Sequence, residues 1–284
     1  MNTSGVFNES SQIGLMLTEI KSSVPKSIDS TVLKTILHCI DLTSLNATDT
    51  NAGIKAFTEK VNLFSSHFNM DNVAAICIYP SLVPVVKQSL ADKNVKIASV
   101  AGSFPSSQTY LTIKLAECEL AVNKGADELD IVISLGNFFG EQYQAISDEI
   151  ALIKSLLPAT TLKVILETGE LKTLENIYKA SWIAMQSGAD FIKTSTGKSP
   201  VSATPEAVLT MCIAIRNYFA ETGRKVGIKA SGGIVTPEDA FYYYNIVASQ
   251  LGNDWLNNSY FRIGASRLAN NILTSILSTP VTWF

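Results

Sequence analysis

Eight short apolar segments, separated by longer segments with helical periodicity, constrain the fold of this chain most strongly. Several are continuous apolar runs, which is typical of parallel strands that are buried on both faces. The predicted strands are His38–Leu42, Ala74–Tyr79, Val95–Val100, Glu128–Ser134, Leu162–Glu167, Asp190–Thr194, Val226–Ala230 and Tyr260–Gly264. Eight strands in regular alternation with helices predict an α/β fold, namely a (β/α)8 (TIM) barrel.

The main alternative is a doubly wound open sheet. Such a sheet needs fewer strands, and no G-x-G-x-x-G motif follows the first predicted strand. Residues 1–37 precede the barrel and are partly helical in pattern. We expect them to form an N-terminal helical extension that caps the N-terminal end of the barrel, while residues 38–284 form the catalytic barrel domain.

Composition excludes several classes of function. The net charge is −3 among 284 residues, so no electrostatic argument supports a nucleic-acid partner. No run of 18 apolar residues and no secretory signal pattern is present, and we expect no membrane partner. The four cysteines form no C-x-x-C pair and there are only two histidines, which argues against a metal site. These features favour a cytoplasmic protein.

An internal repeat places two charged residues in comparable positions. NKGADELDIV and QSGADFIKTS each end a helix with glycine and then enter a strand, and the fifth residue after the glycine is Asp130 in one copy and Lys193 in the other. Gly125 and Gly188 suit a helix C-terminus because glycine adopts a left-handed conformation freely. Equal offsets predict that Asp130 and Lys193 point into the barrel at similar height.

A second lysine, Lys229, stands at the end of the next predicted strand after that of Lys193. Two buried lysines that lie close together favour a neutral amine, which is the form that attacks a carbonyl group. At roughly 6 Å and an effective dielectric of about 20, their repulsion is about 2.8 kcal/mol, or about two pKa units. We predict Lys193 as the nucleophile of a Schiff-base enzyme, Lys229 as the group that lowers its pKa, and Asp130 as part of a proton relay. The alternative is a structural ion pair between Asp130 and Lys193.

Glycine-rich loops follow the sixth, seventh and eighth predicted strands. Barrels often bind phosphate with such loops and a helix N-terminus, because glycines let backbone N–H groups approach the anion. The candidate phosphate-binding residues are Gly197, Lys198, Gly232, Gly233, Gly264 and Ser266. Arg267 either assists them or is simply solvated.

Several motifs together resemble the deoxyribose-phosphate aldolase family, over about residues 40–269. They are IDLTSL, AAICIYP, GADELDIVIS, LKVILETGEL, GADFIKTSTGK, KASGGI and FRIGAS. The resemblance implies a barrel that reversibly cleaves 2-deoxy-D-ribose 5-phosphate to D-glyceraldehyde 3-phosphate and acetaldehyde, without a metal or organic cofactor. It also implies that Lys193 forms the Schiff base, that Asp130 and Lys229 assist it, and that the glycine-rich loops bind phosphate. Further polar or pocket-lining positions of the family fall on Asp41, Thr43, Cys77, Lys163 and Thr196.

The chain departs from the family pattern at three places: Ser103-Phe104-Pro105 after the third strand, Arg267 in the phosphate loop, and a final Phe284 where some members have tyrosine. The last departure predicts slower proton exchange at the acetaldehyde-derived carbon. A homodimer is an option that the resemblance suggests. The aromatic residues Trp182 and Tyr242–Tyr244 either serve such an interface or pack against the barrel.

Other functions stay open at this point. A lysine-dependent aldolase for a larger ketose phosphate would share the nucleophile and the phosphate loops. A non-catalytic sugar-phosphate sensor would need the loops but not a neutral amine. A metal-dependent aldolase is disfavoured by the two scattered histidines, His38 and His67.

Overall fold

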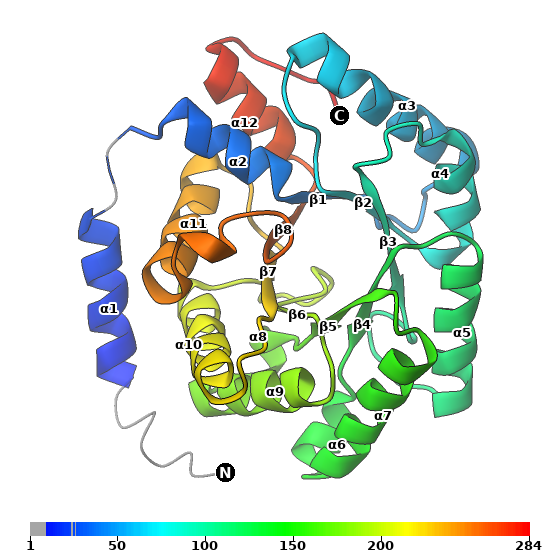
Figure 1. Cartoon of the computed structure of the whole chain (residues 1–284), viewed down its shortest axis with the longest axis vertical. Helices are drawn as coiled ribbons and strands as arrows, with labels where there is room; N and C mark the ends of the chain where they lie inside the picture. The colour runs from blue at the N-terminus through cyan, green and yellow to red at the C-terminus, as the bar shows by residue number, and fades with distance from the viewer. Residues whose placement is uncertain (1–9, 24, 26) are drawn as a thin grey trace.

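The computed structural model describes residues 10–23, 25 and 27–284. Eight parallel strands close into a barrel in the order of the sequence, and helices surround the strands (Figure 1). The predicted (β/α)8 barrel is confirmed. The strands are β1 Ile40–Thr43, β2 Ala75–Ile78, β3 Lys96–Ala101, β4 Glu128–Val132, β5 Thr161–Ile165, β6 Phe191–Lys193, β7 Gly227–Ser231 and β8 Phe261–Ala265.

Every predicted strand is present, with ends shifted by one or a few residues. The largest difference in kind concerns His38, which ends a helix and does not begin the first strand. The helices before β5 are α1 Ser10–Ser23, α2 Ser30–His38, α3 Asn51–Phe68, α4 Val83–Ser89, α5 Leu111–Asn123, α6 Leu135–Phe139 and α7 Tyr143–Leu156. The later helices are α8 Thr168–Leu171, α9 Leu174–Gln186, α10 Pro205–Thr222, α11 Pro237–Leu251 and α12 Leu268–Leu277. Short 3-10 turns at Pro80–Leu82 and Asn253–Trp255 complete the elements.

Local sequence explains where the long outer helices begin. Helix α10 starts with Pro205 after the N-cap Thr204, whose side chain accepts a hydrogen bond from the third residue of the helix. Helix α11 repeats the arrangement with Thr236 and Pro237, and Asp239 completes a capping box. Proline suits the first turn because its missing N–H group would have no partner there, and the threonine satisfies one of the others.

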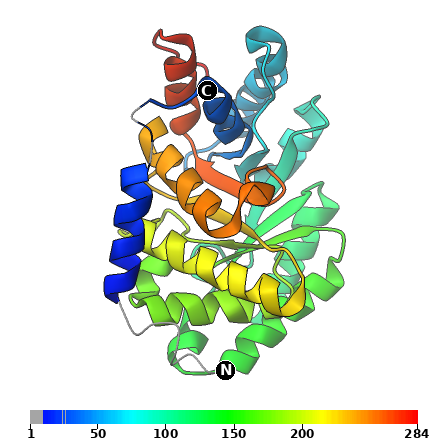
Figure 2. The same ribbon diagram turned by 60° about the vertical axis from the view of Figure 1, so that its left-hand side comes forward.

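The N-terminal helices lie against the outer helices of the barrel. Helix α1 packs on α10 and α11, at one flank of the molecule (Figures 1 and 2). Tyr242 donates a hydrogen bond to the carbonyl of Leu17 in this interface. Helix α2 packs on α11 and α12. The division into an extension (1–37) and a barrel domain (38–284) stays a prediction, because α2 spans the boundary and residues 1–9, 24 and 26 lie outside the described residues.

The apolar core lies between the strands and the helices, whereas charged side chains fill much of the barrel interior. The aromatic residues considered for an interface belong to the packed fold: Trp182 stacks on Tyr178 and Tyr243 is buried. No helix in the described part of the chain is long and apolar enough to span a membrane.

Candidate active site

Lys193 and Lys229 lie side by side on β6 and β7, where they are partners in the strand register. Both amines donate to one carboxylate oxygen, Asp130 Oδ2, each over 2.7 Å. The two nitrogens are therefore at most 5.4 Å apart, which is twice that distance. The predicted meeting of these three residues is confirmed. The ion pair between Asp130 and Lys193, which is the alternative interpretation of these residues, is present as well.

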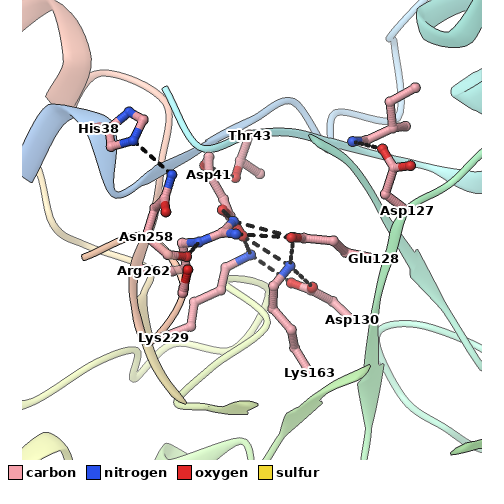
Figure 3. Close-up of polar contacts among 12 residues, drawn as sticks. His38, Asp41, Thr43, Asp127, Glu128, Asp130, Lys163, Lys229, Asn258 and Arg262 are labelled. Carbon is pink, nitrogen blue, oxygen red and sulfur yellow. Dashed lines mark hydrogen bonds and ion pairs between the residues drawn. The ribbon is translucent and has the colours of Figure 1, made fainter. Parts of the chain in front are cut away.

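Further charged side chains lie next to Asp130 and Lys229 (Figure 3). Lys163 contacts three carboxylates: Glu128 Oε2 at 2.5 Å, Asp130 Oδ1 at 3.1 Å and Asp41 Oδ2 at 3.3 Å. Lys229 also reaches Asp41 Oδ2, at 2.5 Å. All of these side chains come from strands and are almost completely excluded from water. Such burial is tolerable only because each charge has an oppositely charged partner.

The pKa of Lys193 is lowered. Burial is the main cause and the charge of Lys229 adds to it, against the opposing effect of Asp130. Burial also lowers the pKa of Lys229, but Asp130 and Asp41 together outweigh it, and the net shift of Lys229 is upward. Burial would raise the pKa of Asp130, yet Lys163 and the other two lysines hold it well below its ordinary value. The site therefore combines a weakened lysine cation with a persistent carboxylate.

A count of charges identifies the same lysine. The interior network holds three carboxylates (Asp41, Glu128, Asp130) and four basic side chains (Lys163, Lys193, Lys229, Arg262). Within the described residues, Lys193 contacts one carboxylate, whereas each of the other three bases contacts two or three. The base that loses its proton most readily is the one with the fewest anionic partners.

A cavity of about 240 Å³ opens above Lys193. Its lining includes Lys198 and Arg267 but no aspartate or glutamate among the described residues. The candidate phosphate-binding residues all line it, and so do Thr43 and Thr196. Helix α12 points its N-terminus at this region and has no side-chain N-cap, which leaves backbone N–H groups free for an anion. Arg267 also has no side-chain partner among the described residues, so its charge is free for a ligand.

At two positions in these loops, neighbouring atoms come too close to the backbone for any residue other than glycine. Gly232 has φ +84°, and a Cβ atom there would lie 2.4 Å from Ser202 Oγ. A Cβ atom at Gly264 would lie 2.8 Å from Ser231 Cβ and 3.1 Å from Lys229 Cε. Gly264 on β8 thus leaves room for the side chain of Lys229.

Glu167 supports the loop that follows β6. Its carboxylate accepts hydrogen bonds from Thr196 Oγ1 (2.5 Å) and from the Thr196 backbone N–H (3.2 Å), and the same hydroxyl accepts from the Lys198 N–H (3.0 Å). Lys198 Nζ in turn reaches the carbonyl of Leu45 at 2.5 Å, which ties this loop to the one after β1. Glu167 itself has φ +54°, an unusual conformation for a residue with a side chain.

The remaining predicted residues, Asp41, Cys77 and Lys163, lie in the barrel interior and are not part of the cavity lining. Asp41 and Lys163 belong to the charge network and are fully buried. Cys77 packs with Ala98 and Val100, and burial raises the pKa of its thiol. Sequence reasoning missed Glu128, Arg262 and Glu167 as parts of the site. Glu128 stands two residues before Asp130, so strand alternation puts both side chains on one face, and that spacing was a usable signal.

Comparison with known proteins decides the family. The sequence profile of the DeoC/LacD family aldolases matches residues 35–247. The chain belongs to the DeoC/LacD aldolase family. Two mammalian relatives of this DeoC/LacD aldolase are named deoxyribose-phosphate aldolase. The human protein is 40% identical over 265 residues, which cover 89% of this chain and 83% of the relative. The mouse protein is 38% identical over 283 residues, with 96% and 87% covered.

Solved structures support the same fold. The deoxyribose phosphate aldolase of Aeropyrum pernix, described as tetrameric, superposes on this DeoC/LacD aldolase with a TM-score of 0.69. The match covers 94% of this chain and 98% of that one, at 23% identity. At this identity the likeness establishes the fold alone.

Proposed function

We propose that this protein is a deoxyribose-phosphate aldolase, which reversibly cleaves 2-deoxy-D-ribose 5-phosphate to D-glyceraldehyde 3-phosphate and acetaldehyde through a Schiff base on Lys193. The single observation that carries the proposal is the position of Lys193. It is a buried amine that shares one carboxylate oxygen with a second lysine, and it lies at the base of a cavity lined by cations. The names of the relatives support the choice of substrate.

The reaction follows from an uncharged Lys193. Its nitrogen lone pair attacks C1 of the open-chain sugar, and loss of water from the carbinolamine leaves an iminium ion. The C3 hydroxyl then gives up its proton, the C2–C3 bond breaks, and the bonding electrons move to C2 to form an enamine. Glyceraldehyde 3-phosphate leaves. A proton returns to C2, and water hydrolyses the resulting iminium ion to acetaldehyde and free Lys193.

Asp130 is proposed to move the protons of these steps, and Lys229 is proposed to lower the pKa of Lys193. Asp130 lies 2.7 Å from Lys193 Nζ and remains ionised, so it can accept a proton directly or through a water molecule. Lys229 keeps its own charge and sits on the same oxygen, so it holds the carboxylate of Asp130 in place and stabilises its negative charge. The iminium ion is positive, and the fixed carboxylate stabilises it without further rearrangement.

The phosphate group is proposed to lie among the loops after β6, β7 and β8. Backbone N–H groups around Gly197, Gly232 and Gly233, the Ser266 hydroxyl and the start of α12 would hold it, with Lys198 and Arg267 nearby. The lack of carboxylates in the described lining favours an anionic substrate. Thr43 and Thr196 line the same cavity and are proposed to contact the sugar hydroxyls.

We propose that no metal or organic cofactor takes part, because the iminium ion itself is the electron sink. In support, the described residues contain no group of three or more histidine, cysteine, aspartate or glutamate side chains placed to hold a metal ion. Undiminished turnover in the presence of a chelator is the expected result. We also propose a cytoplasmic location, consistent with four free, buried cysteines.

A homodimer is proposed as the assembly. Helix α5 and the residue before it expose large apolar side chains: Tyr110 is 82% exposed, Leu120 56% and Ile113 55%. Large apolar side chains exposed along one helix suit association with a second copy. Light scattering of the protein, compared with a variant in which Ile113 and Leu120 are replaced by lysine, tests the proposal. A native monomer would contradict it.

Borohydride trapping tests the function itself. Incubation with acetaldehyde and borohydride is expected to leave an ethyl group on Lys193, located by peptide mass spectrometry, and Lys193→Leu should not be labelled. Cleavage of deoxyribose phosphate is then compared with cleavage of ketose phosphates, which separates this activity from that of another lysine-dependent aldolase. A protein that binds the sugar phosphate but never forms the adduct would be a sensor, and the proposal would fail.

A further inference from the structure

Arg262 occupies a central position in the barrel interior, although it does not line the cavity. Its Nη1 atom lies 2.5 Å from Asp41 Oδ1 and its Nη2 atom lies 2.9 Å from Glu128 Oε1. Its Nε atom donates to the carbonyl of Asn258, whose side chain contacts His38 Nε2 at 2.8 Å (Figure 3). The guanidinium group is thus held on both sides, and the residue Arg262 is 5% exposed.

Six of the seven interior charges balance one another. The carboxylates of Asp41, Glu128 and Asp130 are matched by three bases, each of which contacts at least two of them: Lys163, Lys229 and Arg262. Lys193 is the seventh group and has no anion of its own. In the described part of the chain, the carboxylate oxygen that it contacts is Asp130 Oδ2, which Lys229 already holds.

We infer that Arg262 is a positioning residue for the reaction: it satisfies Glu128 and Asp41, so that Lys163 stays on Asp130 and Lys193 remains the one uncompensated amine. This inference rests on the proposed role of Lys193 as the nucleophile. It goes beyond that role because it assigns control of the nucleophile to a residue on β8 that does not touch it.

The contacts of Lys163 explain how the effect is transmitted. This lysine is shared among Glu128 (2.5 Å), Asp130 (3.1 Å) and Asp41 (3.3 Å). Without Arg262, the network would hold three carboxylates and three lysines in all. Glu128 and Asp41 would then draw Lys163 and Lys229 toward themselves, and Asp130 would have Lys193 as its main partner. A proton would stay on Lys193, because a carboxylate without other partners favours the charged form.

The other groups around Lys193 do not offset this effect. From β2 comes Cys77, whose thiol stays protonated because burial raises its pKa. From β3 come only the apolar residues Ala98 and Val100, which pack with Cys77. The ionisable groups of the remaining strands are the seven already counted, namely Asp41, Glu128, Asp130, Lys163, Lys193, Lys229 and Arg262.

Competitive acetylation of Lys193 with acetic anhydride, followed across pH by peptide mass spectrometry, tests the inference. Arg262→Gln is expected to raise the midpoint of labelling by about one pH unit, which reduces labelling at neutral pH about tenfold. Arg262→Lys keeps the charge and should restore most of the native midpoint. Glu128→Gln alone removes an anion and should lower the midpoint. The double variant Glu128→Gln/Arg262→Gln removes one acid and one base and should return near the native value.

Arg224→Gln is the matched control. Arg224 binds the carbonyls of Met185, Gly188 and Ala189 outside the network, so its loss should reduce stability and leave the midpoint unchanged. If Arg262→Gln does not fold, Glu128→Gln and the double variant still test the inference. The labelling midpoint of Lys193 must be higher in the double variant than in Glu128→Gln. An unchanged midpoint in folded Arg262→Gln, or no rise between those two variants, would overturn the inference. Acetylation needs no turnover, so failure of the proposed activity would appear in the borohydride experiment and not here.

Discussion

Lys193 and Lys229 are register partners on neighbouring strands, and their amines bind the same oxygen of Asp130 at 2.7 Å each. Two positive charges on one oxygen cannot both be fully compensated by it. Lys229 also pairs with a second carboxylate, that of Asp41, whereas Lys193 has no second carboxylate partner within the described residues. The difference in partners makes one lysine a persistent cation and the other a candidate nucleophile.

Removal of the cation on Lys229 should shift the reaction to higher pH. In Lys229→Met, the pKa of Lys193 loses one of the two influences that lower it, while Asp130 still raises it. The free amine therefore becomes scarcer at neutral pH, and kcat/KM should fall about a hundredfold there, with partial recovery in alkaline solution. A pH profile of kcat/KM measures this. A loss of activity that is equal at all pH values would contradict the role of Lys229.

Asp130→Asn should separate imine formation from turnover. The pKa of Lys193 falls further when the carboxylate that raises it is gone, so acetaldehyde should still be trapped on Lys193 by borohydride. Overall cleavage should drop by about 10² to 10⁴ because the proton relay is lost. The extent of borohydride trapping on Lys193 and the steady-state rate of cleavage are measured on the same sample. If trapping disappears together with turnover in a folded variant, Asp130 does more than transfer protons.

Gly232→Ala should weaken recognition of the phosphate group. The new Cβ would approach Ser202 Oγ to 2.4 Å, and the backbone has φ +84°, so the loop must move. KM for the phosphorylated sugar should rise about tenfold, with little change for unphosphorylated 2-deoxyribose. Gly223→Ala is the control, since it has φ +70° and open space around it, and it should lower stability alone. Equal effects on the two sugars would contradict a phosphate site here.

Arg267→Ser replaces the one departure that lies in the phosphate loop. Its guanidinium lines the cavity and lacks a partner in the described part of the chain. The substitution should raise KM for deoxyribose 5-phosphate several-fold and make it less sensitive to salt, because one exposed cation contributes about 1 kcal/mol. KM measured at two ionic strengths tests this. An unchanged KM at low salt would show that Arg267 is only solvated.

Phe284→Ala should affect stability and leave catalysis near its native rate. The ring of Phe284 stacks on Phe64 of α3 at 5.6 Å, and Asn270 binds the backbone of the same residue. Loss of this packing should lower the free energy of unfolding by about 1–3 kcal/mol. Thermal unfolding and kcat are compared. A large fall in kcat without a change in the unfolding midpoint would show that the final residue acts in the reaction.

The sequence predicted the barrel because its strands are short and nearly continuous in apolar residues, a pattern that needs no tertiary information. It also placed Asp130 and Lys193 together, through the repeated Gly-Ala-Asp entry to their strands. The pairing of Arg262 with Glu128 was missed for a physical reason. The two residues are 134 positions apart, and their contact depends on closure of the barrel, which brings β8 and β4 to face each other across the interior. Lys163 was predicted to line the pocket, but it pairs with three carboxylates in the barrel interior and does not reach the cavity.

The central claim concerns the protonation of one amine, and the most direct measurement is site-resolved acetylation of the native lysines as a function of pH. The account predicts that Lys193 becomes reactive at a lower pH than an ordinary lysine, whose pKa is about 10.4, while Lys163 and Lys229 remain unreactive. A midpoint for Lys193 at or above that ordinary value, in the folded native protein, would contradict it.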